Sequence, residues 1–152
     1  MRFVLEHTLS PNKILVELKR VLKPGGHLVV IDLDGLIFNL HHQDETLGHN
    51  LNLLQKHLPI DLFIGRKLPR MLMEAGLELS ECHVQPMLFQ GEDLESEVEN
   101  MLMRFSQCEF IIKDIIGQDQ FETFTQSYIS EMRESRAIFC NKFIVSAQKT
   151  KD

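Results

Sequence analysis

The sequence lacks the features that mark several classes of protein. Its three cysteines, Cys82, Cys108 and Cys140, form no CxxC motif and no Cys–His pair at zinc-ligand spacing, so we interpret them as free thiols in a reducing compartment. No apolar run approaches the ~20 residues of a membrane span, and no basic-then-apolar segment at the start indicates a signal peptide. The formal charge of −6 argues against a general binder of nucleic acid. We therefore expect a cytoplasmic protein that binds neither membranes nor nucleic acid.

The remaining composition is that of a globular α/β domain. Hydrophobic residues make up 43% of the chain and charged residues 25%, and 152 residues are enough for one core. We found no internal repeat, low-complexity tract or linker. The sequence therefore predicts a single domain over residues 1–152.

The first third of the chain reads as strand, helix and strand. Residues 3–5 (Phe-Val-Leu) form a short apolar run closed by polar residues, which predicts a buried strand. Ser10-Pro11 is typical of a helix start, and residues 23–26 (Lys-Pro-Gly-Gly) are typical of a helix end. Residues 28–31 are apolar on both faces, as in a central parallel strand. This βαβ unit predicts an α/β fold.

The rest of the chain continues this alternation. Residues 36–57 predict one or two helices, residues 65–75 one further helix, and residues 77–87 a strand. Apolar residues then recur at helical spacing, which predicts a helical insertion over residues 92–135. Its Met and Phe residues would either cap an apolar acceptor pocket or form ordinary core. Residues 138–147 predict a last strand.

Several of these segments resemble class I S-adenosylmethionine-dependent methyltransferases. The run Val-Leu-Glu-His ending at His7, then Arg-Val-Leu-Lys-Pro-Gly-Gly ending at Gly26, then a hydrophobic strand ending at Asp32, is similar to the family's fourth and fifth strands and the helix between them. Residues 65–77 and 139–149 are similar to the helix before the sixth strand and to the antiparallel seventh strand. The resemblance implies a partial Rossmann-like methyltransferase sheet, strands four to seven of the family, in which the seventh strand lies between the fifth and the sixth.

The family's N-terminal cofactor-binding motif is missing. No Gly-x-Gly occurs in the sequence, and the acid of the second strand and the adenine contacts of the third also have no counterpart. The resemblance therefore implies that the chain is the C-terminal half of a methyltransferase domain. The full-length parent would transfer a methyl group from S-adenosylmethionine to a small-molecule acceptor. This chain alone would be inactive and would bind the cofactor poorly.

Candidate site residues lie where the two predicted parallel strands end. Glu6 and His7 follow the first strand, where they would line the cofactor pocket, and His7 is the candidate for catalysis by orienting or deprotonating the acceptor. Asp32 and Asp34 end the next strand and are candidates for the substrate pocket. In the alternative interpretation His7 only bonds to local backbone and the aspartates are solvated. We predict no metal site, because His42, His49 and His57 are more than a helical turn apart.

Two further expectations concern partners and alternatives. Without the family's first strand, residues 3–5 would present an unpaired apolar edge, so we expect self-association through this N-terminal edge. The alternative function is a non-catalytic, methyltransferase-like module that dimerises or supports a catalytic partner. An unrelated nucleotide-binding domain is disfavoured, since no phosphate-binding glycine motif is present.

Overall fold

The computed structural model describes residues 1–151, which divide into two compact units. Unit 1 consists of Met1–Leu36, Pro59–Met87 and the C-terminal segment from Cys140. Unit 2 consists of Ile37–Leu58 and Leu88–Phe139. The predicted insertion over residues 92–135 thus lies in unit 2, which also takes in residues 37–58.

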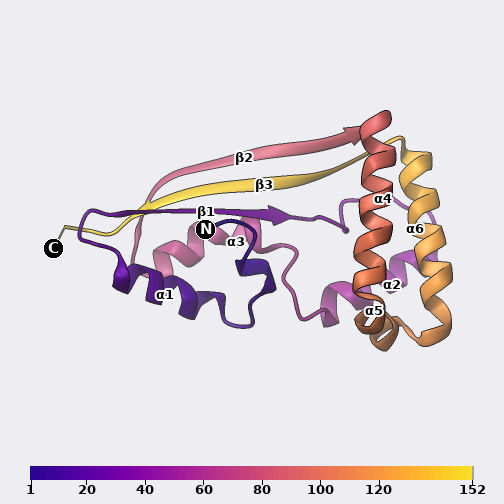
Figure 1. Ribbon diagram of the computed structural model, residues 1–152, viewed down its shortest axis with the longest axis horizontal. Coiled ribbons are helices and arrows are strands. Elements are labelled where there is room, and N and C mark those ends of the chain that lie inside the picture. Colours follow the sequence, from indigo (N-terminus) through magenta and orange to yellow (C-terminus); the bar gives the residue numbers. More distant parts are fainter. Residues whose placement is uncertain (152) are drawn as a thin grey trace. The chain divides into compact units, whose positions relative to one another are not determined.

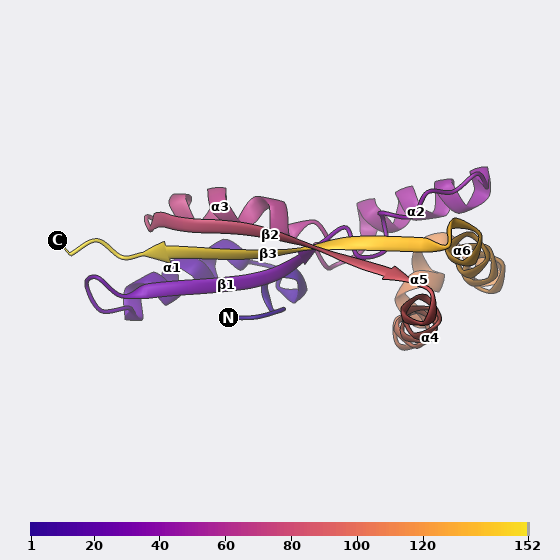
Figure 2. The same cartoon turned by 90° about the horizontal axis from the view of Figure 1, so that it is seen from above.

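A three-stranded sheet organises unit 1. It contains β1 (His27–Asp34), β2 (Glu78–Gln90) and β3 (Ala137–Gln148) in the order β1-β3-β2. Figure 2 shows the last strand of the chain, β3, running antiparallel between the other two strands. Its register on β1 places Val145 opposite Val30. This confirms the predicted α/β class and the predicted antiparallel last strand between its neighbours.

Two helices cover one face of this sheet. They are α1 (Pro11–Val21) and α3 (Ile64–Glu74), and Figure 1 shows both on the same side of the strands. Alternate residues of β1 point into the resulting core, whereas Val29, between them, remains 44% exposed on the other face. The core of unit 1 is aliphatic and includes Leu5, Leu15, Val30, Leu68, Leu72 and Val145, all fully buried. Within residues 1–151, unit 1 places no helix on the second face of the sheet.

The prediction of a strand over residues 3–5 is wrong. Only Arg2 forms a parallel bridge, to Ile31, whose N–H donates to Met1 O and whose carbonyl accepts from Phe3 N, both at 2.9 Å. Phe3 then takes φ 52°, a left-handed conformation that carries the chain out of the ladder. Leu5–His7 form a short 3-10 helix, η1. The parallel neighbour of β1 is therefore reduced to one bridge.

Unit 2 is helical. It contains α2 (Glu45–His57), α4 (Glu92–Gln107), α5 (Glu109–Ile116), η2 (Gln118–Gln120) and α6 (Phe121–Ser135). An aromatic cluster forms its centre, with the rings of Phe105 and Tyr128 edge to face at 5.0 Å and Phe124 beside both. Tyr128 donates its hydroxyl to Ile37 O at 3.1 Å. These aromatic residues are therefore ordinary core, as one of the two interpretations of the sequence had it.

Candidate functional site at the ends of the N-terminal segment and β1

Asp32 holds the turn that follows the N-terminal segment. Its carboxylate is fully buried, and it accepts hydrogen bonds from Leu5 N through Oδ2 and from Leu33 N through Oδ1, both at 3.1 Å. Burial raises the pKa of Asp32 above its ordinary value, although the backbone N–H groups around it act in the opposite direction. Asp32 thus serves as a cap for η1 supplied by a neighbouring strand.

Asp34 caps the start of α3 in the way that Asp32 caps η1. It is 1% exposed and accepts from Arg66 N at 2.9 Å, while the Arg66 guanidinium lies 2.6 Å from its Oδ1. That guanidinium also stacks on the ring of Phe63, 4.6 Å from its centroid. Because α3 has no cap from its own N-cap side chain, Asp34 fixes the start of this helix on β1.

Gly65 explains how α3 can approach β1 so closely. A Cβ at this position would lie 2.7 Å from Cδ2 of Phe143 and 2.9 Å from the carbonyl oxygen of Leu33. Only a residue without a side chain therefore fits between the helix and the two strands. No local sequence signal distinguishes Gly65 from the other glycines, because its contacts lie far away along the chain.

Glu6 and His7 lie on η1, at the end of the segment that Asp32 holds. Glu6 is 5% exposed and its Oε1 lies 3.2 Å from Nε2 of His7, whose side chain is 59% exposed. The carbonyl of Glu6 accepts from Asp61 N at 2.9 Å, which ties η1 to the loop before α3. Asp61 in turn accepts from Phe63 N at 3.1 Å and pairs with Lys67 at 2.6 Å. A buried carboxylate therefore orients an exposed imidazole.

Of the four predicted site residues, His7 is the one that faces solvent in the described part of the chain. Asp32 and Asp34 are sequestered in backbone and ion-pair contacts, so a ligand reaches them only if those contacts open. Residues 1–151 contain no group of three or more His, Cys, Asp or Glu side chains that could hold a metal ion. Asp61 and Arg66 were not among the predicted site residues, because Glu6 and Asp34, which they contact, lie far from them along the chain.

A concavity in unit 1 borders α3 but carries no excess charge. It has a volume of about 500 Å³ and is lined in part by Arg66, Lys67 and Arg70. Each of these cations already has an acidic partner: Asp34, Asp61 and Glu74, respectively. The basic rim is therefore neutralised by its own neighbours, which does not favour an anion site.

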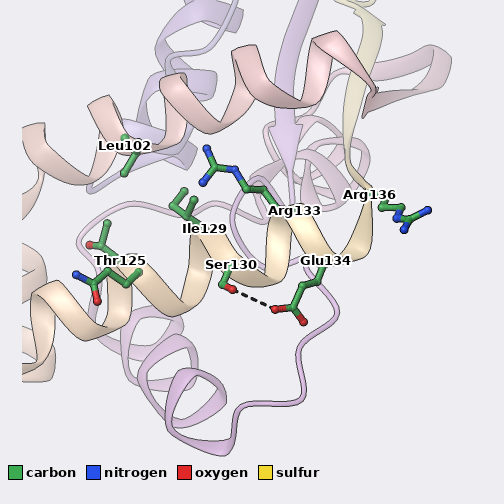
Figure 3. Close-up of a pocket in the computed structure, with 8 residues that line it drawn as sticks. Leu102, Thr125, Ile129, Ser130, Arg133, Glu134 and Arg136 are labelled. Carbon is green, nitrogen blue, oxygen red and sulfur yellow. Dashed lines mark hydrogen bonds between the residues drawn. The ribbon is translucent and has the colours of Figure 1, made fainter.

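Unit 2 has a pocket of its own between α4 and α6 (Figure 3). Its volume is about 630 Å³, within the range of small-molecule sites. Leu102 of α4 and Ile129 of α6 form its apolar part. Among its polar groups, Ser130 donates to Glu134 at 3.1 Å, and Arg133 pairs with Glu95 at 3.0 Å. Thr125 Oγ1 is buried and has no hydrogen-bond partner among residues 1–151.

Comparisons with known proteins agree with this fold. Residues 1–30 match a family model described as "Methyltransferase domain". No sequence match to a curated protein was found. No helix within residues 1–151 is long and apolar enough to cross a membrane.

Solved structures match over almost the whole chain. A protein of Bacillus halodurans C-125 described as a candidate methyltransferase has 19% identity and a TM-score of 0.53, with coverage of 98% of this chain and 67% of that one. The cyclase SpnF has 17% identity and a TM-score of 0.50, with coverage of 99% and 48%. Phosphoethanolamine N-methyltransferase 2 of Haemonchus contortus, solved with phosphomonomethylethanolamine and S-adenosylhomocysteine, has 16% identity and a TM-score of 0.45, with coverage of 98% and 32%.

The chain thus has the fold of part of a Rossmann-like methyltransferase, and the predicted resemblance to class I methyltransferases is confirmed. It spans about two thirds of one of these solved structures and about half of another. One protein of this fold is a cyclase, so the fold by itself does not select the reaction.

Proposed function

We propose that this chain takes part in S-adenosylmethionine-dependent methyl transfer to a small-molecule acceptor. The observation that carries the proposal is the sheet order β1-β3-β2, with an antiparallel last strand in the middle, next to an N-terminal segment that matches a methyltransferase family model. Methyl transfer to a nucleophilic acceptor depends mainly on aligning three atoms: the nucleophile, the methyl carbon and the sulfur that leaves. A turn such as η1, with one oriented polar side chain, would therefore be enough for this chain to contribute to that alignment.

The residues of η1 are assigned the ligand contacts. In open α/β sheets ligands bind beyond the carboxyl ends of the strands, and Glu6 and His7 lie on η1, which is held by Asp32 near the carboxyl end of β1. His7 is exposed and would contact the cofactor or the acceptor, while Glu6 orients its ring. Asp32 positions both by holding the turn. Asp34, the other substrate-pocket candidate, anchors α3.

The 152 residues do not by themselves fit a complete S-adenosylmethionine site. The sequence contains no Gly-x-Gly, and the two carboxylates at the end of β1 are buried in contacts with Leu5 and Arg66 rather than available to ribose hydroxyls. We therefore expect weak cofactor binding by this chain and assign the missing contacts to residues outside it.

Calorimetric titration with S-adenosylhomocysteine tests the proposal. We expect no saturable binding in the micromolar range for the chain itself, and micromolar binding once the residues encoded in frame upstream of Met1 are included. In that longer protein His7→Ala should weaken binding, whereas Leu9→Ala, at a residue 88% exposed, should not. Micromolar binding by the 152 residues alone would contradict the assignment.

A non-catalytic supporting module is the second candidate. It is favoured by one observation: Asp32 and Asp34, the carboxylates at the end of β1, are both used to hold the fold. A stop codon directly upstream of Met1, together with no cofactor binding by the 152 residues, would select this function over methyl transfer.

A further inference from the structure

We propose that the outer edge of β2, over residues 78–86, is a homodimer interface, in which two copies of the chain pair antiparallel about Cys82. The pairing would join the two sheets into one continuous sheet across a two-fold axis. The proposal concerns association and does not depend on the reaction. It rests on an uncovered edge strand, on the direction in which Pro86 faces and on the order of side chains in β2.

β2 borders the sheet on the side away from the N-terminal segment. Figure 2 shows β1 and β2 on opposite sides of β3, and the bridge between Arg2 and Ile31 lies on the outer edge of β1. Chain that precedes Met1 therefore meets the sheet at β1. The free edge of β2 does not depend on where the sequence begins.

This edge strand is long and uncovered. β2 has 13 residues, about twice the usual length of a strand, and the side chains of residues 78–86 are all exposed. Within residues 1–151, none of their backbone groups bonds to a residue outside the strands of the sheet. Lysine often protects such edges, but β2 contains neither Lys nor Arg. The edge is therefore a template for another strand, and it is available without any change of structure.

Pro86 shows which residues of β2 turn their backbone outward. Proline has no N–H, so inside a sheet it lies on an edge strand with its nitrogen facing away from the ladder. Backbone groups alternate in direction along a strand, so Ser80, Cys82 and Val84 face outward as well. With Cys82 opposite its own copy, Ser80 would lie opposite Val84, and each of these pairs would exchange both hydrogen bonds. Pro86 would fall at the end of the ladder, opposite Glu78, where its missing N–H matters least.

The side chains of β2 favour the same register. It places Glu81 of each copy directly opposite His83 of the other, and these two residues already pair within one strand, with Oε2 and Nε2 3.2 Å apart. An imidazole N–H that faces a carboxylate oxygen can donate a hydrogen bond across the strands. A register centred on Val84 would instead set Cys82 opposite Pro86 and lose ladder bonds. The sequence of β2 therefore specifies Cys82 as the axis.

Disulfide trapping tests the axis. Cys82 is exposed, and in a hydrogen-bonded pair its two Cα atoms would lie about 5.5 Å apart, within the span of a disulfide. In a Cys108→Ser protein we expect mild oxidation to give a covalent dimer, with peptide mapping showing a link between two copies of Cys82. The matched control combines Cys82→Ser with Leu79→Cys, another exposed position of β2, whose two copies would lie about 20 Å apart. Equal cross-linking of both proteins would overturn the proposal.

Mixed cross-linking tests the register. In a protein carrying Cys82→Ser and Cys108→Ser, chains with Ser80→Cys should link to chains with Val84→Cys, because these two positions face each other across the axis. Neither variant alone should link, because its own two copies would lie about 14 Å apart. Links within one variant that are as frequent as the mixed links would contradict antiparallel pairing about Cys82.

Removing one outward donor tests the pairing in solution. By sedimentation equilibrium, Val84→Pro should weaken dimerisation at least about tenfold, because the two-fold symmetry removes the hydrogen bond twice. The nitrogen of residue 84 faces away from β3, so the ladder within one chain should persist, as far-UV circular dichroism can show. Val84→Thr is the matched control, since it keeps the N–H and should change the dimerisation constant by less than about twofold.

The protein that includes the residues encoded in frame upstream of Met1 should dimerise in the same way, because its added chain meets the sheet at β1. A protein of either length that stays monomeric at about 100 μM would refute the proposal. Equal dimerisation of the Val84→Pro and Val84→Thr variants would do the same, as would pairing of this edge with a different protein in place of a second copy.

Discussion

Replacing Asp34 with alanine should lower the free energy of unfolding by about 3 kcal/mol, which is large for a residue outside the apolar core. The buried carboxylate makes two kinds of bond: it caps α3 through Arg66 N at 2.9 Å, and it binds the guanidinium of the same residue at 2.6 Å. A helix cap contributes about 1 kcal/mol. A hydrogen bond to a charged group contributes roughly 1.5–3 kcal/mol, and we take about 2 because the Arg66 side chain is 55% exposed and regains water when released.

Urea unfolding followed by far-UV circular dichroism measures this loss. With a slope of about 2 kcal/mol per molar urea, the midpoint should fall by about 1.5 M. Glu74→Ala is the matched control on the same helix, because it removes only the exposed pair with Arg70 and should cost less than ~0.5 kcal/mol. If Asp34→Ala unfolds within about 0.3 M of the unsubstituted protein, the view that β1 caps α3 is refuted.

Three more outcomes follow from individual contacts. Since burial raises the pKa of Asp32, its ionisation opposes folding, so the stability of the unsubstituted protein relative to Asp32→Asn should rise as the pH falls through that raised pKa toward 3.8, measured by urea unfolding at several pH values. Tyr128→Phe should cost about 1 kcal/mol, because it leaves the buried carbonyl of Ile37 without the hydroxyl at 3.1 Å. Gly65→Ala should cost about 1–3 kcal/mol, seen as a lower Tm, because the added methyl group meets Leu33 O.

Elements defined by local signals were predictable from the sequence. The helix started by Ser10-Pro11 is present as α1, and the helix predicted over residues 65–75 is present as α3, Ile64–Glu74. The boundary between α4 and α5 was missed, because it falls at Cys108 with neither proline nor glycine to mark it. The local sequence pattern predicts a helix whose backbone hydrogen bonds are made within the helix itself. It does not predict a helix boundary that is set by packing against other elements.

The N-terminal segment shows where a local sequence pattern predicts the wrong structure. The apolar run of residues 3–5 fits a strand, but a strand needs partners, and here the Asp32 carboxylate takes the N–H groups that the ladder would have used. Glu6 and His7 are neighbours in the chain, so their proximity could be inferred from the sequence. The bond between Asp34 and Arg66 joins residues 32 positions apart, and no periodicity in the sequence reports it.

The position of β3 has a consequence for biosynthesis. The strand that lies between β1 and β2 is translated after both of them, and its pairing brings Gln148 opposite His27. During synthesis β1 therefore remains without its hydrogen-bonding neighbour until β3 has also left the ribosome. A frameshift or a protease cut before β3 would consequently remove the central strand of the sheet and not an edge strand.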